Sequence, residues 1–166
     1  GFMPSIERIL EEVPKDRQTM MFSATFTREI ADLTKRMQRD AVRIQVGAPA
    51  SPAKDVKQGV YTVHGDKKLS LLASILREPH VTSTLVFLRT KHRTDRIAKA
   101  LHAEGFKAQA IHGGRTQSQR QQAIDGFRNG RYTVLVATDV AARGLDVHGI
   151  SHVVNFDVPN CSDDYI

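Results

Sequence analysis

The sequence predicts an α/β fold in which a parallel β-sheet is flanked by helices. Short apolar runs alternate along the chain with longer segments whose apolar residues recur at helical spacing. Val134–Ala137 is an apolar run bounded by polar residues, which is typical of a short strand buried on both faces. Ligands of such sheets bind beyond the carboxyl ends of the strands. We therefore expect the functional residues where strands end.

Residues 1–46 predict two helices and two strands. The first helix is indicated by apolar residues at helical spacing, namely Ile6, Ile9, Leu10 and Val13. A strand over residues 18–22 follows, then a helix over 28–38 and a last strand over 41–46. Residues 47–56 combine prolines with small residues, which is typical of an extended linker, and we place a domain boundary there.

The same alternation of strands and helices continues after the linker. The expected strands cover residues 59–64, 84–88, 108–112, 134–137 and 152–156. The expected helices cover residues 67–76, 94–103 and 117–127. Gly105 is expected to close the second of these helices in the left-handed conformation.

The strand over 134–137 ends in the sequence A-T-D-V-A-A-R-G-L-D, which carries groups suited to a phosphate ligand. Thr138 offers a hydroxyl, Arg143 a planar guanidinium, and Gly144 lets backbone N–H groups approach an anion. Asp146 would repel phosphate, so it should face sugar hydroxyls, an arginine or a cation. The alternative is that Thr138 and Asp139 cap the next helix and that Arg143 is a solvated surface charge.

The whole ten-residue sequence closely resembles motif V of the DEAD-box RNA helicases, a branch of the superfamily 2 helicases. This resemblance implies that Thr138, Arg143 and Gly144 contact the RNA backbone. It also implies that Asp146 reaches the ATP ribose and the interface between two domains. The implied fold is RecA-like, with a parallel sheet flanked by helices.

Ser23-Ala24-Thr25 follows the expected strand over 18–22 and resembles motif III of the same family. The resemblance implies that the hydroxyls of Ser23 and Thr25 couple the ATPase carboxylates to the closed domain interface. Without the family, hydroxyls after a strand would be read as helix caps.

Residues 84–88 are followed by the basic sequence Arg89-Thr90-Lys91-His92-Arg93, which resembles motif IV. The pattern Phe-x-Arg-Thr-Lys-His is most similar to the RhlE-type bacterial branch of the family. The resemblance implies that Arg89 and Thr90 hold an RNA phosphate. The alternative is an ordinary helix N-terminus whose charges face water.

Gln117 and Arg120 match the family pattern Gln-x-x-Arg, which contacts RNA or the domain interface, and they share a helix face. Gly113, just before this helix, is a further implied RNA contact. The family usually has Gly-Asp after the histidine, whereas this chain has Gly113-Gly114, so the local hydrogen bonding is expected to differ. A structural salt bridge is the competing role for Arg120.

The resemblance covers essentially the whole chain and implies its domain organisation. Residues 1–46 correspond to the C-terminal part of a first RecA-like, ATP-binding domain, and residues 47–56 to the linker. Residues 57–166 correspond to a second RecA-like domain, with the Val-x-x-Asp-x-Pro pattern of the family at 154–159. We expect the chain to begin just after the Asp-Glu-Ala-Asp motif and to stop just before motif VI.

The charge distribution also favours an anionic partner. The chain has 24 Lys and Arg against 18 Asp and Glu, a net charge of +6. Residues 85–100 and 107–145 together carry +8, so the remainder is slightly acidic. Basic residues near expected site loops suggest nucleic acid, although a few solvated helix faces would give the same count. One cysteine and no long apolar run suggest a cytoplasmic location without disulfides or membrane spans.

The chemistry missing from the sequence limits what this chain can do by itself. There is no G-x-x-x-x-G-K-[ST] sequence to hold ATP phosphates, no Asp-Glu-Ala-Asp carboxylates for Mg²⁺ and no motif VI arginine. No histidine or cysteine pattern predicts a metal site. We expect the parent protein to use ATP and Mg²⁺ to clamp RNA and unwind it locally, and this chain alone to be inactive as an ATPase. A non-catalytic RNA- or protein-binding module and a superfamily 2 DNA helicase are the alternatives.

Overall fold

The computed structural model describes residues 3–23, 26, 28–46, 56–138 and 147–159 of the 166-residue chain. These residues belong to two compact units, Gly1–Val56 and Lys57–Ile166. We describe each unit by itself. In the described part of the chain no helix is long and apolar enough to cross a membrane.

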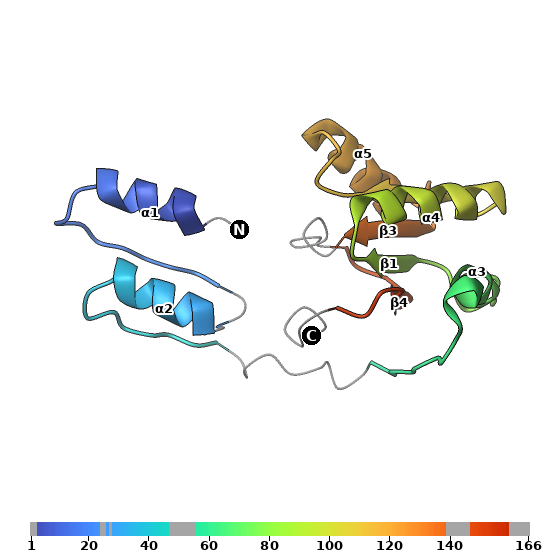
Figure 1. The fold of residues 1–166 in the computed structure, drawn as a ribbon, viewed down its shortest axis with the longest axis horizontal. Helices are drawn as coiled ribbons and strands as arrows, with labels where there is room; N and C mark the ends of the chain where they lie inside the picture. The colour runs from blue at the N-terminus through green and yellow to red at the C-terminus, as the bar shows by residue number, and fades with distance from the viewer. Residues whose placement is uncertain (1–2, 24–25, 27, 47–55, 139–146, 160–166) are drawn as a thin grey trace. The chain divides into compact units, whose positions relative to one another are not determined.

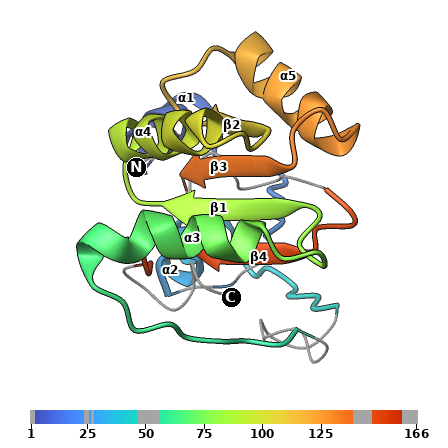
Figure 2. The same cartoon turned by 90° about the vertical axis from the view of Figure 1, so that its right-hand side faces the viewer.

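The second unit is built on a four-stranded parallel sheet (Figure 1 and Figure 2). Its strands are β1 (Thr84–Leu88), β2 (Ala108–Ile111), β3 (Val134–Thr138) and β4 (His152–Asn155), in the order β2-β3-β1-β4. Strands β1 and β3 lie in the centre, and the side chains of Val86, Leu135 and Val136 are fully buried. The predicted parallel α/β architecture is confirmed.

Helices cover both faces of this sheet, each over its own hydrophobic core. The helices are α3 (Lys68–Leu76), which follows the short turn η1 (Gly65–Lys67), then α4 (Lys91–Ala103) and α5 (Gln117–Arg128). Helices α3 and α4 pack on the face that carries Val86, Leu88, Val134 and Val136 (Figure 2). Helix α5 packs on the opposite face, against Leu85, Ile111, Leu135 and Ala137. Consecutive strand residues thus serve opposite cores, as the two-residue period of a strand requires.

One predicted boundary in this unit is wrong. We expected a basic loop before a helix over 94–103, but α4 already begins at Lys91. Thr90 is its N-cap, because the Thr90 hydroxyl accepts a hydrogen bond from the Arg93 N–H at 3.4 Å. Most of the expected loop is therefore the first turn of the helix. The helix is followed by Gly105 at a φ of 89°, as predicted.

The first unit contains the two predicted helices, α1 (Met3–Glu12) and α2 (Arg28–Met37). Polar side chains connect its segments. The Gln38 side-chain amide donates to the Thr19 carbonyl at 3.0 Å, and Arg36 pairs with Glu7 at 3.1 Å. Among the described residues of this unit, Leu33 is the one buried hydrophobic side chain. The unit therefore has very little core of its own.

Three predicted strands are not found among the described residues. Residues 18–22, 41–46 and 59–64 form neither helix nor strand. Most of their apolar side chains face solvent, with Phe22 89% and Val46 95% exposed. A segment forms a strand only when a neighbouring strand pairs with its backbone N–H and C=O groups. An alternating apolar pattern in the segment itself does not provide such a neighbouring strand.

Candidate nucleic-acid interface

The parallel sheet of the second unit brings several predicted site residues to one edge. Leu88 pairs with Thr138 across β1 and β3, and Ile111 pairs with Ala137 across β2 and β3. Because all strands run in the same direction, the residues that follow them gather at this carboxyl edge. The predicted residues located there are Arg89 and Thr90 after β1, Gly113 after β2, and Thr138 at the end of β3.

Arg89 has a partner inside the protein that the sequence did not predict. Its Nε and Nη2 lie 3.1 Å and 2.7 Å from the carbonyl oxygen of Val158 and donate hydrogen bonds to it. The backbone N–H of Arg89 also donates to Asp157 at 3.3 Å. Arg89 therefore holds the segment after β4 while its side chain stays exposed at the carboxyl edge.

The N-terminus of α4 presents backbone N–H groups and positive side chains together. Thr90 caps the helix, as the alternative interpretation of this segment required. The first turn contains no acidic residue, and Lys91 and His92 are exposed. A helix N-terminus carries partial positive charge, so lysine here is unfavourable for helix stability. The same arrangement of charges suits a bound phosphate.

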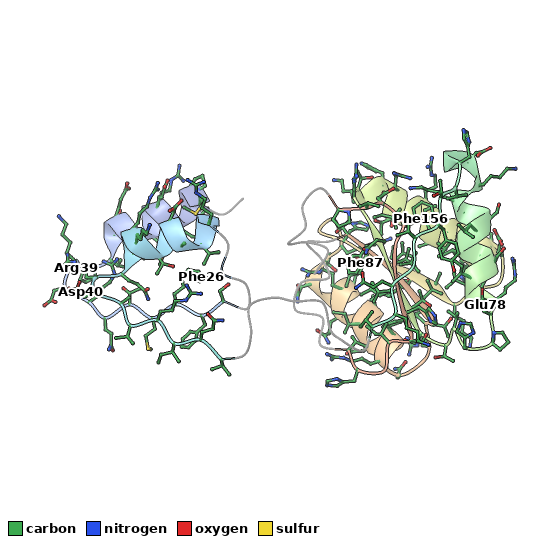
Figure 3. All side chains as sticks on the ribbon, turned by 90° about the horizontal axis from the view of Figure 1, so that it is seen from below. Phe26, Arg39, Asp40, Glu78, Phe87 and Phe156 are labelled. Atoms are coloured by element: carbon green, nitrogen blue, oxygen red, sulfur yellow. The ribbon has the colours of Figure 1, made fainter. Side chains whose placement is uncertain are left out.

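A buried carboxylate, Asp157, ties four elements together beside this edge. Its side chain is 6% exposed, and both of its oxygens accept hydrogen bonds from Arg93 Nη1, at 2.8 and 2.9 Å. Lys68 of α3 lies 3.9 Å from Asp157 and donates to the Phe156 carbonyl at 2.8 Å. Both cations also lie within 6 Å of the Phe156 ring, which Figure 3 labels in the second unit. The sequence marked this aspartate only as the Asp of the Val-x-x-Asp-x-Pro pattern at 154–159 and predicted none of its partners.

A second cluster, which sequence reasoning also missed, joins α4 to the turn after β2. We call it the Asp95 cluster, and it consists of Asp95, His112 and Arg115. Arg115 Nη2 donates to Asp95 Oδ1 at 2.6 Å, and Nε2 of the buried His112 lies 3.1 Å from the same oxygen. Burial raises the pKa of Asp95, but the neighbouring His112 and Arg115 outweigh it and hold that pKa below its usual value.

Gln117 and Arg120 share one face of α5, as predicted. Arg120 Nη1 donates to Gln117 Oε1 at 3.3 Å. Arg120 Nε is buried and has no hydrogen-bond partner among the described residues, which also show no ion pair to Arg120. The structural salt bridge that competed for Arg120 is thus absent from the part of the chain that the structure describes.

Several predicted site residues lie outside the described residues. These are Thr25 of the motif III sequence, and Arg143, Gly144 and Asp146 of the motif V sequence. Thr138, the first hydroxyl of motif V, is described and half-buried at the end of β3, and Ser23 is described and exposed. Among the described residues there is no group of three histidine, cysteine, aspartate or glutamate side chains that could hold a metal ion.

Comparisons with known proteins agree with this architecture. The family model of the helicase conserved C-terminal domain matches residues 67–166. A structure of the DEAD-box protein SrmB of E. coli, bound to the regulator of ribonuclease activity A, is similar with a TM-score of 0.59 and 40% identity, over 61% of this chain and 60% of that one.

Two further solved structures match nearly the whole chain. A DEAD box protein of Methanococcus jannaschii has a TM-score of 0.64 and 35% identity, covering 99% of this chain and 44% of that one. Dbp5 of S. cerevisiae, bound to RNA and ADP BeF3, has a TM-score of 0.83 and 29% identity, covering 98% of this chain and 42% of that one. The chain therefore spans 60% or less of these relatives' lengths. It belongs to the family of helicase conserved C-terminal domains, of the kind found in DEAD-box RNA helicases.

Proposed function

We propose that this chain is part of an ATP-dependent RNA helicase and that the carboxyl edge of the second unit grips the RNA backbone. The observation that carries the proposal is the convergence of hydroxyl, guanidinium and backbone groups at the ends of parallel strands. It is supported by the similarity to Dbp5 bound to RNA and ADP BeF3. In the whole protein, we expect this grip to clamp single-stranded RNA and to open duplex RNA locally as ATP is hydrolysed.

The residues assigned to RNA serve backbone contacts rather than base reading. They are Arg89, Thr90, Gly113, Gln117, Arg120, Thr138, Arg143 and Gly144. Hydroxyls, guanidinium groups and peptide N–H groups bind phosphate oxygens, which all sequences share. Binding is therefore expected to tolerate any RNA sequence and to weaken as salt rises.

The domain boundaries of the proposal follow from the sequence. Residues 1–46 belong to the end of a first RecA-like domain, residues 47–56 form the linker, and residues 57–166 belong to the second RecA-like domain. We also propose that the protein belongs to the RhlE-type branch and is located in the cytoplasm.

We propose that the whole protein binds ATP and Mg²⁺ and that most of their ligands lie outside this chain. The described residues do not fit a Mg²⁺ site, because they contain no suitable cluster of ligands. Asp146 is our candidate for the ATP ribose, and Ser23 and Thr25 are candidates for coupling ATP hydrolysis to domain closure. No chemical step is assigned to the described residues, and we expect no phosphate release when this chain is incubated with ATP and RNA.

Fluorescence anisotropy with a labelled single-stranded RNA tests the RNA grip directly. The chain is titrated at low and moderate salt, with two RNAs of equal length and unrelated sequence. We expect weak binding of equal strength for both RNAs, and a lower affinity at the higher salt. Strong preference for one RNA, or no binding at low salt, contradicts the proposal. Competition with DNA of the same length distinguishes an RNA helicase from a DNA helicase.

Arg143 provides the matching test in the whole protein. Arg143→Ala should lower the RNA-stimulated ATPase activity, because it removes a guanidinium proposed to hold the RNA backbone. The variant should keep its circular dichroism spectrum. ATPase stimulation equal to that of the wild-type protein would show that Arg143 does not contact RNA.

A further inference from the structure

The Asp95 cluster places a carboxylate between two segments proposed to contact RNA. Asp95 lies in α4, one turn after the first helical residue Lys91, and Arg115 lies in the turn between β2 and α5. A carboxylate in such a place opposes the binding of a polyanion through simple Coulomb repulsion. The Asp95 carboxylate should therefore have a structural role whose benefit is larger than the cost of this repulsion.

The contacts of the cluster show what it holds. Arg115 spans from the turn to Asp95 Oδ1 at 2.6 Å, so the carboxylate anchors the turn to α4. In the same turn, the Gly114 N–H donates to His112 Nδ1 at 3.2 Å. The buried His112 ring is thus fixed between the turn on one side and Asp95, 3.1 Å from its Nε2, on the other.

The turn held in this way lies close to the first residue of α4. A Cβ atom built on Gly114 would lie 3.1 Å from His112 Nδ1 and 3.6 Å from Lys91 Cδ. A side chain at this position would therefore press on the histidine ring. At Gly113 nothing lies within 4 Å of such a Cβ, so the backbone there is open to a ligand.

We propose that Asp95, His112 and Arg115 are positioning residues that fix the Gly113–Gly114 turn against the first turn of α4, so that the two segments form one phosphate-binding surface. The inference rests on the proposed function and deepens it. The cluster touches the turn and the helix rather than RNA, and it acts by fixing the distance between the two groups of phosphate ligands.

Asp95→Ala gives a test in which charge and positioning predict opposite signs. If charge alone matters, removing the carboxylate strengthens RNA binding, because it removes a Coulomb repulsion. Loss of positioning weakens binding. We expect the affinity for RNA to fall at least about threefold, which is in the range measured for residues that belong to one interaction network. The matched control is Asp125→Ala, which removes an exposed carboxylate from α5, where Asp125 pairs with Gln121. Its affinity for single-stranded RNA should be unchanged or slightly higher.

Variants at Arg115 distinguish a positioning role of this residue from a direct contact with RNA. If Arg115 acts through Asp95, the Arg115→Gln variant weakens RNA binding, and the double variant with Asp95→Ala weakens it no further than the larger single effect. If Arg115 itself binds phosphate, the Asp95→Ala variant binds as tightly as wild type or more tightly, and the proposal is overturned. Melting temperatures of all variants establish that each is folded at the temperature of the titration.

Amide resonances provide a readout that does not depend on RNA. In the Asp95→Ala variant, the N–H resonances of Gly113 and Gly114 should shift and lose intensity, whereas those of β1 and β3 should stay in place. Unchanged glycine resonances would overturn the positioning role even where RNA binding is altered. Failure of the wild-type chain to bind RNA would instead contradict the proposed function, and the glycine resonances would still decide whether the cluster holds the turn.

Discussion

At the scale of single residues, two carboxylates in the described part of the second unit both contact an arginine but differ in how exposed they are. Asp157 is 6% exposed and receives two hydrogen bonds from Arg93, with Lys68 nearby. Asp95 is about one-third exposed and is held by Arg115 and His112. A buried carboxylate without its partner costs several kcal/mol, so loss of Arg93 should destabilise the second unit. The partly exposed Asp95 is available for a role in positioning.

The lowered pKa of Asp95 predicts how the stability of the second unit depends on pH. Because the folded-state pKa is below the unfolded-state pKa, the charged form favours folding. The contribution of Asp95 is complete above the unfolded-state pKa of about 4 and is lost as pH falls through the lower, folded-state pKa. The free energy of unfolding, measured by denaturant titration between about pH 2 and 7, should therefore fall less steeply in acid for Asp95→Asn than for wild type. Equal slopes for the two proteins would contradict the assignment.

At the scale of elements, α5 is fixed to the start of β3 through a glycine. A Cβ at Gly126 would lie 2.5 Å from the Tyr132 ring, and the Tyr132 N–H donates to the Gly126 carbonyl at 3.0 Å. The ring therefore packs against the helix backbone at Gly126, beside the core under α5. A residue with low helix propensity is retained here because no side chain fits between the helix and the tyrosine.

Gly126→Ala should accordingly destabilise the second unit, although alanine is the better helix former. The propensity gain is about 1 kcal/mol, whereas forcing a methyl group against a packed ring costs about 1–3 kcal/mol. We expect a net loss of about 1 kcal/mol in the free energy of unfolding, measured by urea titration. Gln122→Ala, at an exposed position of the same helix, is the control and should not destabilise. A more stable Gly126→Ala protein would show that the ring moves away freely.

The elements also show where sequence patterns suffice and where they do not. The apolar run at 84–88 coincides with β1, because a strand buried on both faces needs only apolar residues and neighbours. The pattern over 41–46 fails, because its alternating residues have no strand partner among the described residues. The link between Arg93 and Asp157 joins residues 64 positions apart, so no local pattern reveals it. The RNA contacts, including Arg89 and Thr90, stay predictions.

At the scale of the whole molecule, the two units differ in how much side-chain surface they bury. The second unit has a core on each face of its sheet, whereas Leu33 is the one buried hydrophobic residue among those described in the first. Local stability follows the density of buried apolar contacts. The two units should therefore differ in the free energy needed to open their backbone hydrogen bonds.

Amide hydrogen exchange measures this difference residue by residue. Amides of β1 and β3 should exchange slowest, because Val86, Leu135 and Val136 are fully buried in a hydrogen-bonded sheet. Amides of residues 41–46 should exchange close to the rate of an unstructured peptide, because these residues are in no helix or strand and Val46 is 95% exposed. Helix α4 is the internal control with intermediate protection. Slow exchange over 41–46 would mean that this segment pairs as a strand in solution, as the alternation of Val42, Ile44 and Val46 first predicted.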